Sequence, residues 1–218
     1  MTPPLKTPSA ATMAVRTAVI LFLFVVVFTG LLASAYLATR PTIAAAAAAE
    51  KMTLIDEVLP RGSYDNDLLK EAITLPASPA LGQDEASTAY RARRDGKARA
   101  LVLEAVAPDG YAGKIRLLIA FGEDGSVLGV RVTQHKETPG LGDYIEPAKD
   151  RNKQRPWIEQ FNGLAPATID AREWKVRKDG GRFDSVAGAT VTPRAVIKAI
   201  RNAALYVADN REQLFAPQ

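Results

Sequence analysis

One stretch of 23 residues without a charged side chain, residues 17–39, restricts the folds open to this chain more than any other feature. Its side chains are mostly Val, Leu, Phe and Ala, and no face of the run is polar. At about 1.5 Å per residue, a helix of this length crosses the roughly 30 Å hydrocarbon core of a bilayer. We therefore interpret residues 17–39 as a transmembrane helix.

A cleaved signal peptide is the alternative, since the Ala-Ser-Ala sequence at residues 33–35 resembles a small-residue cleavage site. The apolar run exceeds the roughly 7–15 residues of a signal core, which favours an anchor. Lys6 and Arg16 precede the run and only Arg40 follows closely, a bias that predicts a cytoplasmic tail of residues 1–16. The rest of the chain would then lie outside the inner membrane, in the periplasm.

Composition excludes several classes of site. The chain has no cysteine, which excludes disulfides, thiolate metal sites and Cys-ligated iron–sulfur clusters. Its single histidine, His135, excludes any site that needs two imidazoles, and we expect no bound metal. The net charge is +4, but basic residues are interleaved with acidic ones rather than with aromatics. We therefore expect no nucleic-acid binding.

Short β-rich runs separated by turn residues dominate the second half of the chain. They predict strands at residues 87–93, 98–107, 114–121 and 127–134, with candidate strands at 174–177 and 182–184. Helical periodicity predicts helices at residues 44–59, within 145–161, and at 193–209. Strands followed by a packed terminal helix predict an α+β fold, an antiparallel sheet packed with helices behind a single N-terminal transmembrane helix. The expected domains are residues 1–16 (tail), 17–39 (transmembrane), 40–86 (helical or linker segment) and 87–218 (folded domain).

The stretch from Asp184 to Pro193 is the first candidate for chemistry. Small residues at 187–189 precede Thr190, and a helical pattern begins just after. We predict Thr192 as the helix N-cap and Pro193 as the first helical residue. Thr190 would then lie on a tight turn at a helix start, where backbone N–H groups and the helix dipole favour a phosphate. An ordinary capped turn with no ligand is the alternative.

Two further stretches could line a ligand. Residues 110–115, Gly-Tyr-Ala-Gly-Lys-Ile, contain glycines that allow a close backbone approach. Residues 135–142, His-Lys-Glu-Thr-Pro-Gly-Leu-Gly, join the only histidine to an acid, a threonine and a Pro-Gly turn after a predicted strand. Such a loop can lay backbone amides and polar side chains along a flat ligand. A plain surface loop is the alternative.

Together these stretches resemble a known family. Asp184-x-x-Ala187-Gly188-Ala189-Thr190 is similar to the flavinylation motif of FMN-binding domains, Asp-x-x-(Ser/Thr)-Gly-Ala-(Thr/Ser), and residues 135–142 are similar to a loop of those domains. With one N-terminal span, the chain most resembles the G subunit of the Rnf (Rsx) ion-translocating electron-transport complex. The related C subunit of the sodium-translocating NADH:quinone reductase shares the domain and is usually longer. The resemblance covers about residues 87–210 and the anchor.

The resemblance implies FMN held covalently, its phosphate esterified to Thr190 by a separate flavin transferase. Asp184 would present the turn or bind the transferase's metal, and Ala187 stands where the family usually has Ser or Thr, which could slow attachment. We expect the ring to contact residues 110–115 and 135–142. The expected cofactor-binding residues are Asp184, Ser185, Gly188, Ala189, Thr190, His135, Glu137, Thr138, Gly140 and Leu141.

The family role implied is electron relay within a membrane complex that couples ferredoxin and NAD⁺ redox to Na⁺ or H⁺ movement. The implied partners are the other subunits (A to E) of the complex, the flavin transferase and the membrane. With no second redox group in its sequence, the chain would relay electrons rather than act as an independent enzyme. The alternatives are the C subunit of the quinone reductase and a non-redox, membrane-anchored binding or assembly module. The non-redox alternative differs from the flavoprotein at Thr190.

Overall fold

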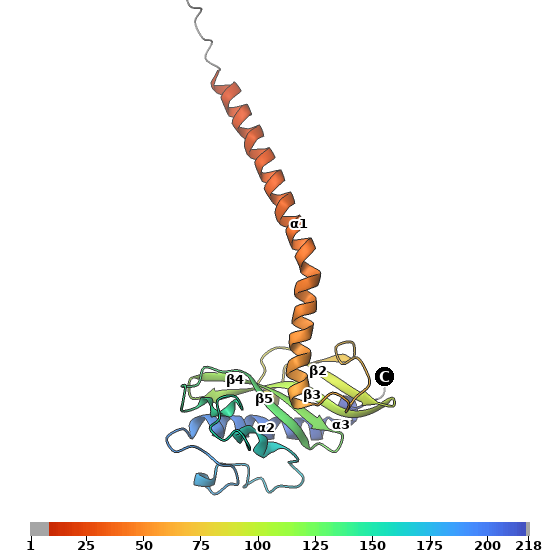
Figure 1. Cartoon of the computed structure of the whole chain (residues 1–218), viewed down its shortest axis with the longest axis vertical. Coiled ribbons are helices and arrows are strands. Elements are labelled where there is room, and N and C mark those ends of the chain that lie inside the picture. Colours follow the sequence, from red (N-terminus) through yellow and green to blue (C-terminus); the bar gives the residue numbers. More distant parts are fainter. Residues whose placement is uncertain (1–8, 217–218) are drawn as a thin grey trace, which may run out of the picture. The chain divides into compact units, whose positions relative to one another are not determined.

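The computed structural model describes residues 9–216. The chain divides between Glu50 and Lys51 into two compact units. The first helix, α1 (Ala10–Val58), begins in the first unit and ends in the second (Figure 1). The helices predicted at 17–39 and 44–59 are therefore parts of one helix. It continues through Pro41, which has no backbone N–H to donate within the helix. Residues 1–8 of the predicted tail lie outside the described residues.

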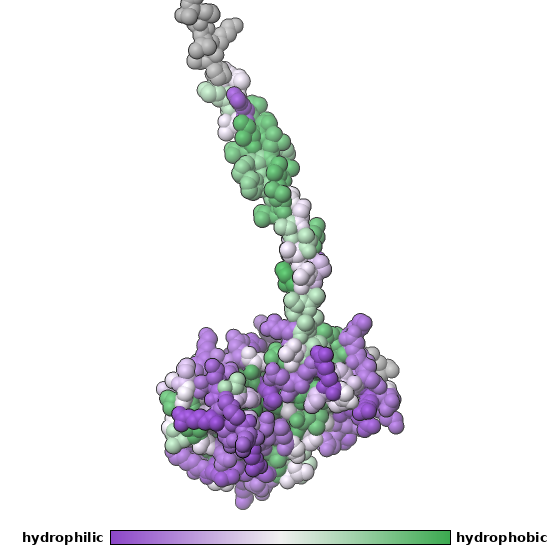
Figure 2. All heavy atoms as spheres, in the orientation of Figure 1, coloured by the Kyte–Doolittle hydropathy of each residue, from purple (hydrophilic) through white to green (hydrophobic). Residues whose placement is uncertain are grey.

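The N-terminal part of α1 is strongly apolar. An 18-residue window of α1 has a mean hydropathy of 2.7, and none of that window is buried. Figure 2 shows the hydrophobic residues as a dense green band over the upper part of the helix, with paler residues below it. By length and composition, this helix can cross a membrane, in agreement with the sequence prediction.

The unit Lys51–Gln218 contains an antiparallel sheet of five strands in the order β1-β2-β3-β4-β5. The four strands predicted between residues 87 and 134 are confirmed, and β1 adds an edge strand ahead of them. The α+β fold class is confirmed as well. The strands are β1 (Ala72–Leu75), β2 (Ser87–Arg94), β3 (Lys97–Gly110), β4 (Gly113–Gly122) and β5 (Val127–Gln134).

Helix α2 (Val191–Asp209) covers one face of the sheet (Figure 1). Its apolar side chains recur every three or four residues and pack against alternate residues of β3 and β4, which places the main core between helix and sheet. This confirms the predicted terminal helix; a single turn, α3 (Arg211–Leu214), follows it. The buried apolar residues of α2 include Ala195, Val196, Ile197, Ile200, Ala203, Ala204 and Val207.

The opposite face of the sheet is covered by the last turn of α1 and the segment after it. Ile55 and Val58 are fully or almost fully buried in a second core cluster with Tyr90 and Val102. Successive residues of β3 point to opposite faces, so Leu101 belongs to the first cluster and Val102 to the second. The central strands are therefore buried on both sides, which makes the sheet a rigid support for the loops at its ends.

The predictions for residues 145–161 and 174–184 are corrected in part. The expected helix within 145–161 is a five-residue 3₁₀ segment, Trp157–Phe161. The candidate strands at 174–177 and 182–184 do not form strands, since a single bridge joins Val176 to Phe183 around a 3₁₀ turn. The apolar residues there enter an aromatic cluster instead of a ladder, and Phe183 stacks on Phe161 with ring centroids 4.7 Å apart.

Candidate functional site

The turn that leads into α2 is held from two sides. The Val186 carbonyl accepts a hydrogen bond from the Ala189 N–H at 3.1 Å, and between them Gly188 has a φ of +83°, which favours glycine. The Tyr144 hydroxyl donates to the Ala189 carbonyl at 3.2 Å. Burial raises the pKa of Tyr144 to about 12, so this donor keeps its proton at neutral pH. Ala187 is exposed on the turn, so the hydroxyl missing relative to the flavinylation motif leaves no buried gap.

The start of α2 differs from the predicted cap. The helix begins at Val191, Thr190 occupies the cap position, and the Thr190 hydroxyl accepts no capping hydrogen bond. Thr192 lies inside the first turn and is 2% exposed, and its hydroxyl donates to the Glu137 carboxylate. The prediction that Thr192 caps the helix was therefore wrong, because a buried carboxylate from a distant loop is the partner of its hydroxyl. Thr190 is left half-buried, with a hydroxyl that caps no backbone N–H.

Three segments far apart in the sequence meet at a cavity of about 280 Å³. They are the β3–β4 turn, the loop of residues 135–142 and the turn into α2, the same three stretches that the sequence pointed to. Tyr111 and Leu141 are exposed at this cavity, so an apolar ring could lie there in partial contact with solvent. The lining residues are Tyr111, Glu137, Thr138, Leu141, Gly142, Gly188, Ala189, Thr190, Val191 and Thr192.

One guanidinium group lies beside the hydroxyl of Thr190. Arg194 Nη1 is 3.4 Å from Thr190 Oγ1. The same side chain is fixed by a bidentate pair with Asp179, at 2.7 Å and 2.8 Å. The hydrogen bond from Arg194 lowers the pKa of Asp179, so the pair is ionised at neutral pH. A phosphate on Thr190 would therefore meet both a positive side chain and the N-terminus of α2.

Two of the expected site residues in the 135–142 loop, His135 and Gly140, do not line this cavity. His135 Nδ1 accepts the backbone N–H of Glu137 at 3.0 Å, and Nε2 lies 2.8 Å from Glu146 Oε1. This pattern assigns the ring proton to Nε2 and gives His135 the role of shaping the loop. The Gly140 N–H donates to Asp143 Oδ1 at 2.8 Å, which closes the same loop.

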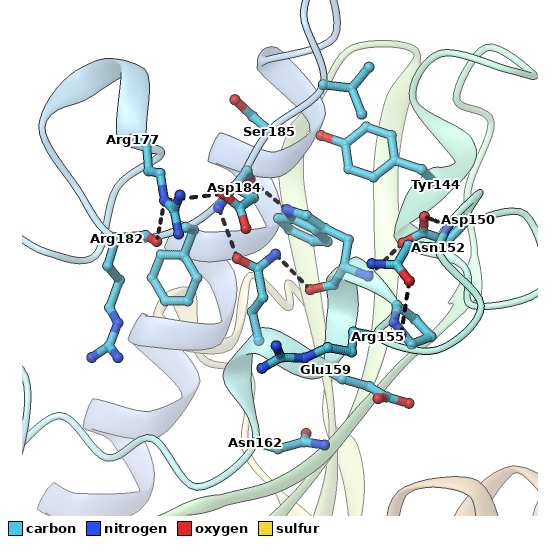
Figure 3. Close-up of a pocket in the computed structure, with 15 residues that line it drawn as sticks. Tyr144, Asp150, Asn152, Arg155, Glu159, Asn162, Arg177, Arg182, Asp184 and Ser185 are labelled. Atoms are coloured by element: carbon cyan, nitrogen blue, oxygen red, sulfur yellow. Dashed lines mark hydrogen bonds and ion pairs between the residues drawn. The ribbon is translucent and has the colours of Figure 1, made fainter.

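Asp184 and Ser185 line a different cavity of about 660 Å³ (Figure 3). The Asp184 carboxylate lies 3.1 Å from Arg177 Nε, and both side chains are largely exposed. The backbone of Asp184 is fixed more firmly, because its carbonyl accepts the Trp157 indole N–H at 2.6 Å and its N–H donates to Gln160 at 2.9 Å. The expected site residues are thus divided between two cavities, and His135 and Gly140 line neither of them.

Sequence reasoning overlooked three residues around the turn and misread a fourth. Tyr144 and Trp157 hold the turn through hydrogen bonds to its carbonyls, and neither stands in a local pattern that would have identified it. Arg194 could have been found, since a residue four positions after Thr190 lies on the same face of a helix. Thr192 was noticed but given a different role.

Comparison with known proteins finds two family matches and several close relatives for this chain. Residues 110–205 match the FMN-binding domain family, and residues 5–58 match the RnfG N-terminal region. The G subunit of the ion-translocating oxidoreductase complex of Pseudomonas aeruginosa strain UCBPP-PA14 is 46% identical over 203 residues, which cover 93% of this chain and 92% of that protein. The corresponding protein of Pseudoalteromonas atlantica is 40% identical over 201 residues, or 92% of this chain and 91% of that protein. The crystal structure of Shewanella oneidensis NqrC covers 69% of this chain and 74% of its own, with a TM-score of 0.47 and 23% identity.

Proposed function

We propose, given that this chain belongs to the RnfG family of ion-translocating oxidoreductase complex subunits, that it is the membrane-anchored electron-carrier subunit of an Rnf-type ferredoxin:NAD⁺ oxidoreductase complex. It would carry FMN in the cavity of about 280 Å³, attached through a phosphoester to Thr190. FMN supplies the one- and two-electron redox chemistry that protein side chains lack. The chain's own contribution is to hold and orient the flavin.

The observation that carries this proposal is the meeting of three segments at one cavity beside the half-buried hydroxyl of Thr190. All three lie within the part of the chain that matches the FMN-binding domain family. At about 280 Å³, the cavity is slightly smaller than the roughly 300–1,000 Å³ typical of ligand sites. Its volume and the exposure of Tyr111 and Leu141 suit a ring system with one side open for electron exchange.

Thr190 is the better acceptor of the two threonines. Its side chain is half-buried, its hydroxyl caps no backbone N–H, and the guanidinium of Arg194 is 3.4 Å away. Thr192 is buried, and its hydroxyl already donates to Glu137. The side chain that hydrogen-bonds to the Thr190 hydroxyl is a guanidinium, which cannot act as a general base, so an external flavin transferase would supply one.

The remaining expected site residues take supporting roles in this proposal. Glu137, Thr138, Leu141, Gly188 and Ala189 would surround the cofactor directly. His135 and Gly140 would shape the loop, and Asp184 and Ser185 would present the turn to the transferase from the neighbouring cavity.

We further propose that residues 1–16 are cytoplasmic, that α1 spans the inner membrane once and that the domain of residues 87–218 is periplasmic. Lys6 and Arg16 before the apolar run, against Arg40 alone closely after it, support this orientation. The partners would be the other subunits (A to E) of the complex. A tether suits an exported flavin, since it keeps the effective concentration high without tight binding.

The test is to produce the full chain in membranes together with a flavin transferase and to examine the denatured protein on a gel for flavin fluorescence. The wild type and Thr192→Ser should give a fluorescent band, and Thr190→Val should give none. A dark wild-type band with active transferase would exclude covalent FMN. A band that persists in Thr190→Val would place the attachment elsewhere. Intact mass of the same samples measures the flavin content independently and detects any cleavage near residue 35.

A further inference from the structure

Glu137 is a buried carboxylate with an unusual position in the site. Its side chain is 4% exposed, although it carries a charge and belongs to a surface loop. None of the ion pairs among residues 9–216 includes it. A buried charge without a counter-ion disfavours folding unless hydrogen bonds compensate, so its presence calls for a specific role.

Each oxygen of Glu137 is bonded to a different segment of the site. Oε1 accepts the backbone N–H of Ala112, in the β3–β4 turn, at 3.0 Å. Oε2 accepts the hydroxyl of Thr192, in the first turn of α2. One side chain thus ties together the three segments that form the cavity of about 280 Å³.

The surroundings leave this arrangement little freedom. The backbone N–H of Glu137 is bonded to His135 Nδ1 at 3.0 Å, which fixes the point from which the side chain extends. A Cβ atom on Gly142 would lie 2.9 Å from Thr192 Oγ1 and 3.0 Å from Glu137 Oε2. Only glycine fits beside the pair without displacing it.

We propose that Glu137 is the positioning residue of the flavin site: it holds the three segments together and keeps a fixed negative charge next to the flavin. This inference rests on the proposed function, because it takes FMN to occupy the cavity. Electron uptake adds negative charge to the flavin, and a nearby carboxylate in a poorly solvated site opposes it. Glu137 therefore lowers the reduction potential of the cofactor in addition to shaping its site.

The first arm of the test uses the full chain without flavin, produced without a transferase and purified in detergent. Exchange of the Ala112 amide hydrogen is followed in the wild type, Glu137→Gln and Glu137→Leu. Gln keeps a carbonyl acceptor for the Ala112 N–H, and the Thr192 hydroxyl can accept from its amide nitrogen, so protection should remain. Leu removes the acceptor, and exchange should become about tenfold faster or more. Equal exchange rates in the wild type and Glu137→Leu would refute the tie.

The second arm uses the flavin-loaded full chain and compares the flavin midpoint potential of the wild type and Glu137→Gln. The potential of the Glu137→Gln chains that carry flavin should move upward. Glu123→Gln is the matched control, since it loses the same charge from an exposed position beyond the other end of β4, and its potential should not move. An unchanged or lowered potential in Glu137→Gln would refute the electrostatic role. Failure of Glu137→Gln to take up flavin while its Ala112 amide stays protected would also refute it.

The two arms separate this inference from the proposed function. A wild-type chain that takes up no flavin contradicts the proposed function, while amide exchange at Ala112 still decides whether Glu137 ties the three segments.

Discussion

Replacing Thr192 by Val removes one hydroxyl from the centre of the site and changes little else. Thr192 is 2% exposed and Glu137 is 4% exposed, so water cannot take the place of the lost donor. A hydrogen bond to a charged group contributes about 1.5–3 kcal/mol to stability, and leaving the charged partner unsatisfied costs a similar amount. Valine has a methyl group where threonine has its hydroxyl, so the substitution leaves almost no cavity that would lower stability further. We expect a loss of about 2 kcal/mol from this hydrogen bond.

The expected loss can be measured by thermal unfolding of the full, flavin-free chain in detergent. Trp157 and Trp174 are both buried in the main core, and α1 contains no tryptophan, so tryptophan fluorescence reports on the domain alone. For a domain of about 150–250 residues, each kcal/mol shifts Tm by about 2–4 °C. Thr192→Val should therefore unfold about 4–8 °C below the wild type.

Thr190→Val is the matched control, with the same substitution two residues earlier. Its hydroxyl is half-buried, and the side chain that bonds to it is Arg194 at 3.4 Å. We expect a change below about 0.5 kcal/mol. Equal Tm shifts for the two variants, or a Thr192→Val value within about a degree of the wild type, would show that the buried Thr192–Glu137 bond contributes nothing.

Two further predictions concern neighbouring groups. Arg194→Gln should reduce the covalent flavin per chain. It should not measurably lower stability, because the pair of Arg194 with Asp179 is partly exposed. As a control, Lys198→Gln breaks the exposed Lys198–Asp109 pair one turn further along α2 and should leave the flavin content unchanged. Burial raises the pKa of Tyr144 to about 12 from an ordinary value of 10.0, so its contribution to stability is complete below pH 10 and is lost as the pH rises toward 12. Over that range the midpoint of denaturation should fall more for the wild type than for Tyr144→Phe, and parallel curves would contradict the burial of this hydroxyl.

Four strands of the sheet and its two flanking helices follow from local patterns in the sequence. Alternating apolar residues with turns at 95–96 and 122–126 define the strands, and the three- and four-residue spacing after residue 193 defines α2. Residues 174–177 and 182–184 were mistaken for strands because Trp174 and Phe183 suit a sheet as well as the aromatic cluster that they enter. Local propensity does not distinguish these two outcomes.

The site was predictable in part. Its three segments carry glycine, proline and threonine patterns that identify them separately, but their meeting at one cavity depends on strand order. The capping role of Thr192 was the natural inference from its neighbours, and a residue 55 positions away, Glu137, changed it. The separation of Asp184 from the cavity has the same origin, since the Trp157 indole and Gln160 fix its backbone from another segment.

The burial of the first turn of α2 has a consequence for the motion of this part of the chain. Helix ends usually fray, with opening free energies near zero, but here Thr192 and Pro193 in the first turn are already buried. Unwinding the start of α2 would expose core residues and break the bond to Glu137, so it should occur only with unfolding of the whole domain. Thr190 would then stay in place for as long as the domain remains folded. Opening events fast enough to matter during electron exchange would have to come from the exposed residues Tyr111 and Leu141 at the edge of the cavity.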